Sequence, residues 1–263
     1  MVVFFGLTYS PRTTYWAWGF LLGLILGFGS LVPLPVLAQS TANPSSAEEA
    51  FVLALTWQPA FCETRTHLPE CASQHPERAD ARALSLHGLW PQPRGTFYCG
   101  VPKSLERIDK RRDWLDLPRL PLSDDLRRRL ESAMPGMMSG LHRHEWIKHG
   151  TCAGWTPEGY FAVSLAMQDL INNSPVGALL ADRIGDQVSR TQLARAMDQA
   201  FGAGAGERLE VICAKDDAGQ RMIRELRISL GPIVEGEGDL GEIIRSAPPV
   251  ENKGCRDGRV DPV

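Results

Sequence analysis

The pattern of hydrophobic and polar positions predicts four strands in this chain. Residues 51–57 (FVLALTW) are apolar or aromatic at almost every position, which is typical of a buried strand. In residues 84–89 (LSLHGL) leucines alternate with Ser85 and His87, so we expect a second strand that carries those two side chains on one face. The same period of two predicts two later strands, at 208–214 and 221–230.

Apolar residues recur at helical spacing in the second half of the chain. Three leucines and a methionine stand four residues apart from Leu122 to Met134, which predicts a helix with one buried face. The Thr-Pro pair at 156–157 is a typical helix start and predicts a helix that continues through residues 159–171. A third helix is expected over 191–201.

Residues 91–121 form a long connection with many charges and no clear periodicity. Connections of this length inside a domain are uncommon and tend to carry function. The chain shows no repeat, low-complexity tract or linker. We therefore expect a single α+β domain in which helices pack on a central, mostly antiparallel sheet, stapled by disulfides.

An apolar segment near the start of the chain is typical of an export signal. Residues 15–32 are apolar or small, and Arg12 precedes them. The expected divisions are a cleaved signal peptide (1–38), a flexible tail (39–50) and the functional domain (51–263). An uncleaved membrane anchor is the alternative, because about 18 apolar residues can just span a bilayer. In either case the domain is exported, and we expect it in the periplasm or secreted.

Composition agrees with a folded, exported domain. The chain is 43% hydrophobic and 22% charged, a normal globular balance. Its six cysteines predict a disulfide framework, although many pairings are open and no two cysteines form a CxxC pair. The net charge is −3, whereas proteins that bind polyanions are usually basic. Any contact with nucleic acid must therefore depend on local charge.

The segment HEWIKHGTC, residues 144–152, concentrates ionisable side chains on one side of a predicted helix. An advance of about 100° per residue places Glu145, Lys148 and His149 on the same side as the first histidine. A zinc-protease helix needs its two histidines four residues apart, but these are five apart and Lys148 holds the position of the second ligand. A cation there repels a divalent metal, so we expect no metal site. These residues alone leave acid–base chemistry and an ordinary solvated helix face open.

A second segment, LSLHGLWPQ at residues 84–92, ends a predicted strand with a histidine, a glycine and an aromatic residue. The strand would hold the imidazole of His87 rigidly beside Trp90, a candidate stacking surface. Either residue alone is more often part of a core or a surface. The motifs HGLWP and KHGTC together resemble the two signatures of the ribonuclease T2 family of secreted endoribonucleases, in particular its bacterial periplasmic type. The resemblance extends over about residues 51–255.

This resemblance implies both the cysteine pairing and the roles of the motif residues. Cys99 would pair with Cys152 and Cys213 with Cys255, which leaves Cys62 for Cys71. His149 would be the general base and His87 the general acid, although the two labels could be exchanged. Glu145 and Lys148 would stabilise the pentacoordinate phosphorus, and His144 would hold the phosphate.

The implied reaction explains why these residue types are needed. Attack of a ribose 2′-OH on the adjacent phosphorus requires a base at the 2′-oxygen and an acid at the departing 5′-oxygen, and two histidines of opposite protonation supply both. Negative charge grows on the phosphoryl oxygens, where a fixed ammonium such as that of Lys148 is favoured. We expect a monomer without cofactor or metal that cleaves single-stranded RNA through 2′,3′-cyclic phosphates. DNA lacks the nucleophile and would not be cleaved.

Substrate-binding residues are harder to predict than catalytic ones. Trp90, Phe97 and Tyr98 are candidates for stacking an unpaired base. Gln92, directly after HGLWP, argues against strong purine preference, so we expect low base specificity. The basic run within 103–112 is better explained as a solvated surface compensated by nearby acids than as a phosphate track.

Two other function classes compete with the endoribonuclease hypothesis. One is a relative without catalytic activity that binds RNA or another partner on the same scaffold, which the intact motif residues argue against. The other is a metallohydrolase, which the spacing of the two motif histidines disfavours. The histidines outside the motifs are expected at the surface, namely His67, His75 and His142.

Overall fold

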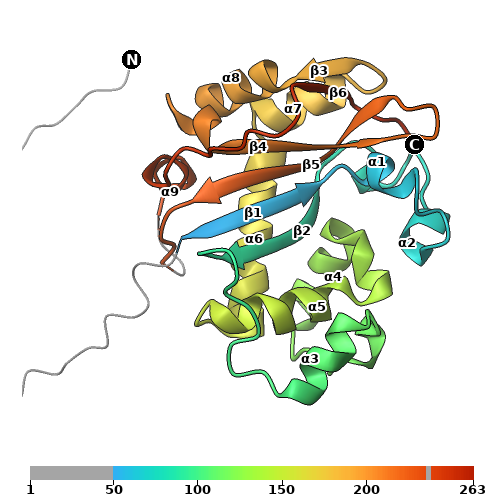
Figure 1. Ribbon diagram of the computed structural model, residues 1–263, viewed down its shortest axis with the longest axis vertical. Helices are drawn as coiled ribbons and strands as arrows, with labels where there is room; N and C mark the ends of the chain where they lie inside the picture. Colours follow the sequence, from blue (N-terminus) through green and yellow to red (C-terminus); the bar gives the residue numbers. More distant parts are fainter. Residues whose placement is uncertain (1–49, 235–237) are drawn as a thin grey trace, which may run out of the picture. The chain divides into compact units, whose positions relative to one another are not determined.

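The computed structural model describes residues 50–234 and 238–263, so the signal peptide expected at 1–38 and nearly all of the tail expected at 39–50 lie outside the described residues. The strands of the described part are β1 Phe51–Thr56, β2 Ser85–Pro91, β3 Gln187–Ser189, β4 Leu209–Lys215, β5 Arg221–Leu230 and β6 Asp257–Arg259 (Figure 1). The four strands predicted from the sequence are β1, β2, β4 and β5, with nearly the predicted bounds.

These strands form one mixed sheet that is mostly antiparallel, which confirms the expected fold class. The order is β2-β1-β5-β6-β3, and β4 pairs with β5 off this path. β1 runs antiparallel to both β2 and β5, and β4 runs antiparallel to β5, whereas β6 is parallel to β5. Because both of its edges are paired, β1 has every residue buried except Val52.

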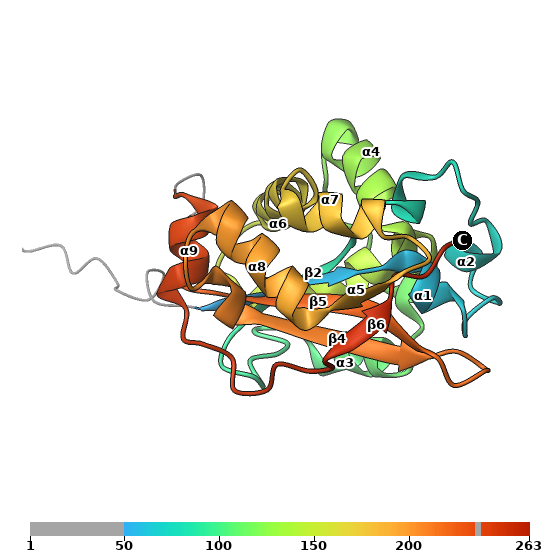
Figure 2. The same cartoon turned by 90° about the horizontal axis from the view of Figure 1, so that it is seen from above.

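Helices pack on both sides of this sheet. The α-helices of the described residues are α1 Gln58–Cys62, α2 Pro69–Ala72, α3 Lys103–Lys110, α4 Asp124–Ala133, α5 Leu141–Lys148, α6 Pro157–Asn172, α7 Pro175–Asp182, α8 Arg190–Phe201 and α9 Leu240–Ser246. Figure 2 shows α6 and α7 on one side of the strands and α3 on the other. None of these helices is long and apolar enough to cross a membrane.

The helix starts follow the local sequence. Thr156 caps α6 as predicted, because its hydroxyl accepts the N–H of Gly159 at 3.1 Å and Pro157 occupies the first helical position. α8 begins with a capping box in which Ser189 and Gln192 bond each other's backbone N–H groups. The helix predicted from the leucine repeat before Met134 is α4.

The hydrophobic core lies between the sheet and α6, α7 and α8. Leu53 of β1, Leu86 of β2, Phe161 of α6 and Leu193 of α8 are all fully or almost fully buried. The hydroxyl of Tyr160 in α6 donates to the Leu89 carbonyl at 2.8 Å and accepts its N–H at 3.1 Å, which fixes β2 against α6.

The other face of the same strands carries polar side chains. Gly88 of β2, Ala54 of β1 and Arg227 of β5 stand in one register row across three strands. Since side chains alternate across a strand, residues neighbouring the core leucines point to this second face. Glu225 stands on the same face as Arg227, two residues away along β5.

The connection at 91–121, expected to be irregular, contains the helix α3, so that expectation was wrong. The sequence of α3, KSLERIDK, has no apolar stripe, and periodicity therefore does not reveal it. Lys103 and Lys110 bind Glu106 at 2.7 and 2.6 Å across one helical turn, and Arg111 binds Asp113 at 2.9 Å. Most of the basic run is thus paired with acids, as the solvated-surface interpretation expects.

Three disulfides join segments of the described chain. They link Cys62 to Cys71, Cys99 to Cys152 and Cys213 to Cys255, which is the pairing that the family resemblance implies. The bond between Cys99 and Cys152 ties the loop after β2 to the short turn after α5. Both segments that carry the sequence motifs are therefore held at a fixed separation.

Candidate active site

Glu145 of α5 lies at the centre of the residues that the motifs single out. Its side chain is almost fully buried, at 1% exposed, and its Oε2 accepts the indole N–H of Trp90 at 2.8 Å. Its Oε1 lies 3.7 Å from Nε2 of His87 and 3.7 Å from Nε2 of His144. One carboxylate therefore contacts side chains from both motifs.

The backbone of β2 is shaped to receive this carboxylate. A Cβ atom at Gly88 would lie 1.9 Å from Oε2 of Glu145, so only glycine allows the close approach. Ala54 pairs with Gly88 and Leu55 pairs with Leu86, so that His87 is the extra residue of a β-bulge. Bulges re-aim a side chain, and this one directs His87 to the polar face of the sheet.

Each of the two histidines that face Glu145 is also bound by a carboxylate of its own. Nδ1 of His87 lies 2.7 Å from Oε2 of Glu225 in β5, and Nδ1 of His144 lies 2.6 Å from Oδ1 of Asp109 in α3. Both carboxylates are buried. These hydrogen bonds orient the rings and leave Nε2 of each directed toward the central glutamate.

The environment of His87 favours its protonated form. Burial alone lowers the pKa of His87, but the hydrogen bond to Glu225 and the negative charges of Glu145 and Glu225 together raise it above its ordinary value. Burial likewise opposes ionisation of Glu225, yet its contacts with His87 and Arg227 lower the pKa of this carboxyl to about 2. The contact between the two side chains therefore favours an imidazolium beside a carboxylate.

His149, at the C-terminal end of α5, has the opposite tendency. It is 4% exposed, and burial is the main reason that its pKa is lowered to about 4. The charges of Lys148, His144 and His87 lower the pKa further, whereas Glu145 opposes them. His149 is therefore neutral under conditions in which His87 is protonated.

One indole packs against both of these imidazoles. The ring centroid of Trp90 lies 5.2 Å from that of His87 and 5.5 Å from that of His149, with the second pair stacked. The ring of Phe97 also lies 5.2 Å from His149, edge to face. The structure thus brings together two histidines that are distant in sequence and that differ in preferred protonation state.

Lys148 supplies a cation close to this group. Its ammonium lies 5.1 Å from the ring of Phe97, and its side chain lines the cleft in front of His87 and His144. Its carbonyl accepts the N–H of Tyr98 at 2.9 Å, one residue before the Cys99 disulfide. The disulfide loop is therefore attached directly to the end of α5.

The residues predicted to bind a base occupy different environments. Trp90 is engaged by Glu145 and His149, and the guanidinium of Arg227 lies 5.2 Å from its ring. The side chain of Gln92 turns back onto the carbonyl groups of Trp90 and Pro91, and the hydroxyl of Tyr98 bonds Asp109 at 2.8 Å. Phe97 is the most exposed aromatic of this group, at 40%, and its ring is therefore the one most open to solvent. Their role in base binding stays a prediction.

The expectation that His142 lies at the surface was wrong. α5 begins at Leu141, so His142 shares the buried face of Glu145 and is itself buried. Burial lowers the pKa of His142 to about 4, with smaller contributions from Arg143 and Arg127. His67 and His75 are exposed, as expected.

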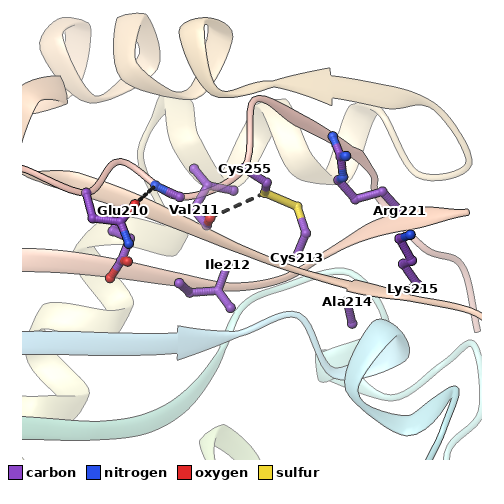
Figure 3. A pocket seen from close by; sticks show the side chains of 10 residues that line it. Glu210, Val211, Ile212, Cys213, Ala214, Lys215, Arg221 and Cys255 are labelled. Carbon is purple, nitrogen blue, oxygen red and sulfur yellow. Dashed lines mark hydrogen bonds between the residues drawn. A yellow bond between two sulfur atoms is a disulfide. The ribbon is translucent and has the colours of Figure 1, made fainter.

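A cleft of about 620 Å³ opens beside the two histidines that face Glu145. His87, His144 and Lys148 line it together with Trp114 and Asp109. A separate recess on β4 surrounds the Cys213–Cys255 disulfide, where Lys215 and Arg221 are exposed and Glu210 is half-buried (Figure 3). No histidine lines that recess, so the cleft is the candidate site.

Three residues of this site could not be recognised from the sequence. Asp109 looked like one of several acids that compensate a basic run, and Glu225 and Arg227 looked like polar positions in an alternating strand. The one available signal was a carboxylate in the middle of a predicted buried strand, at Glu225. In the described parts of the chain, no three His, Cys, Asp or Glu side chains are grouped as metal ligands.

Comparisons with known proteins agree with the motifs. A model of the ribonuclease T2 family matches residues 48–240 of this chain. Ribonuclease I of Escherichia coli is 29% identical over 238 residues, which cover 76% of this chain and 84% of that protein. Ribonuclease MC of Momordica charantia is 26% identical over 137 residues, which cover 50% of this chain and 62% of that protein. A crystal structure of a ribonuclease MC1 mutant has a TM-score of 0.52 at 18% identity and covers 80% of this chain and 99% of that one, which shows a shared fold.

Proposed function

Because this chain belongs to the ribonuclease T2 family, we propose that it is a metal-independent endoribonuclease that cleaves single-stranded RNA with low base specificity. The observation that carries the proposal is the pair of histidines that pack against Trp90, one with a raised pKa and one with a lowered pKa. Titratable groups whose environments push their pKa values apart are suited to act as acid and base in one reaction.

His149 is the general base of the proposed reaction. Its neutral imidazole takes the proton of the ribose 2′-OH, and the 2′-oxygen forms a bond to the adjacent phosphorus. Because His149 is buried, its neighbours must move for a substrate to reach it, and the exposed ring of Phe97 is one of them.

His87 is the general acid. Nε2 of its imidazolium gives a proton to the departing 5′-oxygen as the bond between phosphorus and that oxygen breaks. Glu225 stabilises the imidazolium through Nδ1 and keeps Nε2 directed into the site. The products are a 2′,3′-cyclic phosphate and a 5′-hydroxyl, and attack of water on the cyclic phosphate gives a 3′-phosphate.

The remaining motif residues stabilise the charged phosphorane. Lys148 places an ammonium where negative charge grows on the phosphoryl oxygens. His144, oriented by Asp109, binds a phosphoryl oxygen through Nε2, and Glu145 sets the position of both Nε2 atoms. The proposed steps need only these side chains and the 2′-OH, so DNA is not a substrate.

The three disulfides support an extracytoplasmic location, because such bonds persist in oxidising compartments. We therefore place the protein in the periplasm or outside the cell.

Incubation of the purified protein with single-stranded RNA or with DNA, each with and without EDTA, tests the proposal. The expected result is cleavage of RNA alone, unaffected by EDTA, with His87→Ala and His149→Ala each lowering kcat by about 10² to 10⁴. His75→Ala is the matched control, because His75 is exposed and does not line the cleft. Loss of activity with EDTA indicates a metallohydrolase, and RNA binding without cleavage indicates a relative that only binds.

A further inference from the structure

Three arginines from distant parts of the chain line one region of the cleft. Arg65 lies in the connection between α1 and α2, Arg112 closely follows α3, and Arg224 precedes Glu225 in β5. Glu225 holds His87, so the cleft is continuous from the proposed general acid to these guanidinium groups.

Local backbone features direct all three side chains. Ile212 pairs with Glu225 and Cys213 pairs with Ile223, so Arg224 is the extra residue of a bulge in β5. Arg112 has a φ of 65°, in the left-handed region that few residues other than glycine adopt. Arg65 donates to the Phe61 carbonyl at 3.3 Å, and its guanidinium lies 4.6 Å from the Phe61 ring.

Two other cations of the cleft, outside the proposed catalytic group, have acidic partners. Lys110 binds Glu106 at 2.6 Å and Arg227 binds Glu225 at 2.6 Å. Glu70, a carboxylate that also lines the cleft, accepts the hydroxyl of Ser139 at 2.5 Å. By contrast, no carboxylate among residues 50–234 and 238–263 lies within 4.0 Å of a side-chain nitrogen of Arg65, Arg112 or Arg224.

These unpaired charges repel one another. Burial lowers the pKa of Arg65, and the charges of Arg224 and Arg112 lower it further. A chain of net charge −3 has acids enough to neutralise three arginines, yet this region of the cleft keeps them without partners. An anion that enters the cleft would remove the repulsion.

We propose that Arg65, Arg112 and Arg224 bind the RNA backbone phosphate on the 3′ side of the scissile phosphodiester. Guanidinium groups match phosphate oxygens in pairs of parallel hydrogen bonds, which is why arginine is common at such sites. The assignment to the 3′ side follows from the role of His87, which protonates the 5′-oxygen of the departing nucleoside. The next phosphate along the RNA strand lies beyond that nucleoside, toward the arginines. The inference rests on the proposed function and adds a preference for chains over dinucleotides.

Three small substrates with the same two bases test the inference in the full chain. They are a dinucleoside monophosphate, its 3′-phosphorylated form and its 5′-phosphorylated form. We expect kcat/KM for the 3′-phosphorylated form to exceed that for the unmodified dinucleotide by about tenfold or more, from charge-assisted hydrogen bonds to the added phosphate. The 5′-phosphorylated form should show no such gain.

Substitutions test whether the arginines cause the higher kcat/KM for the 3′-phosphorylated form. In Arg65→Gln/Arg224→Gln and in Arg112→Asn, the ratio of the two kcat/KM values should fall toward one. Asparagine tolerates the left-handed backbone of Arg112, so that variant keeps the fold. Arg195→Gln, an exposed arginine of α8 away from the cleft, should keep the ratio. With longer RNA, the decline of log kcat/KM with log salt should become shallower by about 0.7 for the lost phosphate contact.

Several results would overturn the inference. These are equal kcat/KM for the 3′-phosphorylated and unmodified dinucleotides, a gain from the 5′-phosphate instead, or a gain that survives in both variants. Failure of the wild-type protein to cleave any of the three substrates or RNA refutes the proposed function itself, which separates the two failures.

Discussion

The indole N–H of Trp90 donates to Oε2 of Glu145 at 2.8 Å, so the two sequence motifs meet through one hydrogen bond. Trp90 also stacks on His149, which couples the position of the central carboxylate to that of the proposed base. The indole is therefore a structural part of the site, whatever contact it makes with a base.

Replacement of this indole tests its role. In Trp90→Phe the buried carboxylate loses a donor, and we expect the free energy of unfolding to fall by about 1 to 3 kcal/mol. We expect kcat to fall about tenfold, since His149 and Glu145 lose their common support. Urea unfolding and steady-state kinetics measure the two effects. Trp155→Phe is the control, because Trp155 stacks on Phe51 away from the histidines; an equal loss of kcat in both variants would contradict the assignment.

The pH dependence of kcat/KM should follow the two histidines. His149 must be neutral, so activity is lost as pH falls through about 4, and His87 must be protonated, so activity is lost as pH rises through its raised pKa, above 6.5. Maximal activity is expected between these limits. Rates measured from about pH 3 to about pH 9 check the profile, and a rate that climbs steadily into alkali contradicts it.

Glu225 sets the alkaline limit of that profile. In Glu225→Gln the negative charge is lost while burial still lowers the pKa of His87, so the alkaline limb should move to lower pH by about one unit or more. The acid limb, which reports His149, should stay in place. Glu210→Gln is a close control, because Glu210 contacts Arg227 at 3.7 Å and has no bond to His87. An unmoved alkaline limb in Glu225→Gln refutes the role given to this carboxylate.

The parts of the site that sequence reasoning recovered are those encoded within short segments. His144 and Glu145 lie in one helix and His149 directly follows it, so helical geometry predicts that all three lie on one side. Gly88 and His87 are adjacent, and the alternation in residues 84–89 is enough to predict the strand that carries them. The expected fold class follows for the same reason, since each long strand and helix has its own periodicity.

The parts that could not be recovered depend on contacts between distant segments. Glu225 acquires its role only when β5 lies across β1 from the bulge at His87, and no local pattern encodes that register. Asp109 belongs to α3, whose ion pairs replace the apolar stripe that identifies most helices. The burial of His142 depends on where α5 begins, and sequence patterns locate helix ends less well than helix centres.

The two long-range disulfides should differ in their effect on activity. They close loops of similar sequence separation, 53 for Cys99–Cys152 and 42 for Cys213–Cys255, so removal of either should lower the free energy of unfolding by about 4 kcal/mol. Only the Cys99–Cys152 bond holds the end of α5. Its double serine variant should therefore lose activity at temperatures at which the protein is still folded, whereas the Cys213/Cys255 variant should not. Equal activity of the two folded variants contradicts this reasoning.

Buried His142 should make the fold sensitive to acid. Its pKa is lowered to about 4 in the folded state from the ordinary 6.5, so the unfolded chain binds more protons between these values and stability falls as pH drops through this window. The loss amounts to about 3 kcal/mol near pH 4. In His142→Leu the free energy of unfolding should decline less over the window by about this amount, although His149 still contributes a similar dependence. Urea unfolding at several pH values, with His75→Leu as the exposed control, measures the difference; parallel curves for His142→Leu and the wild type would show that His142 is not the group responsible.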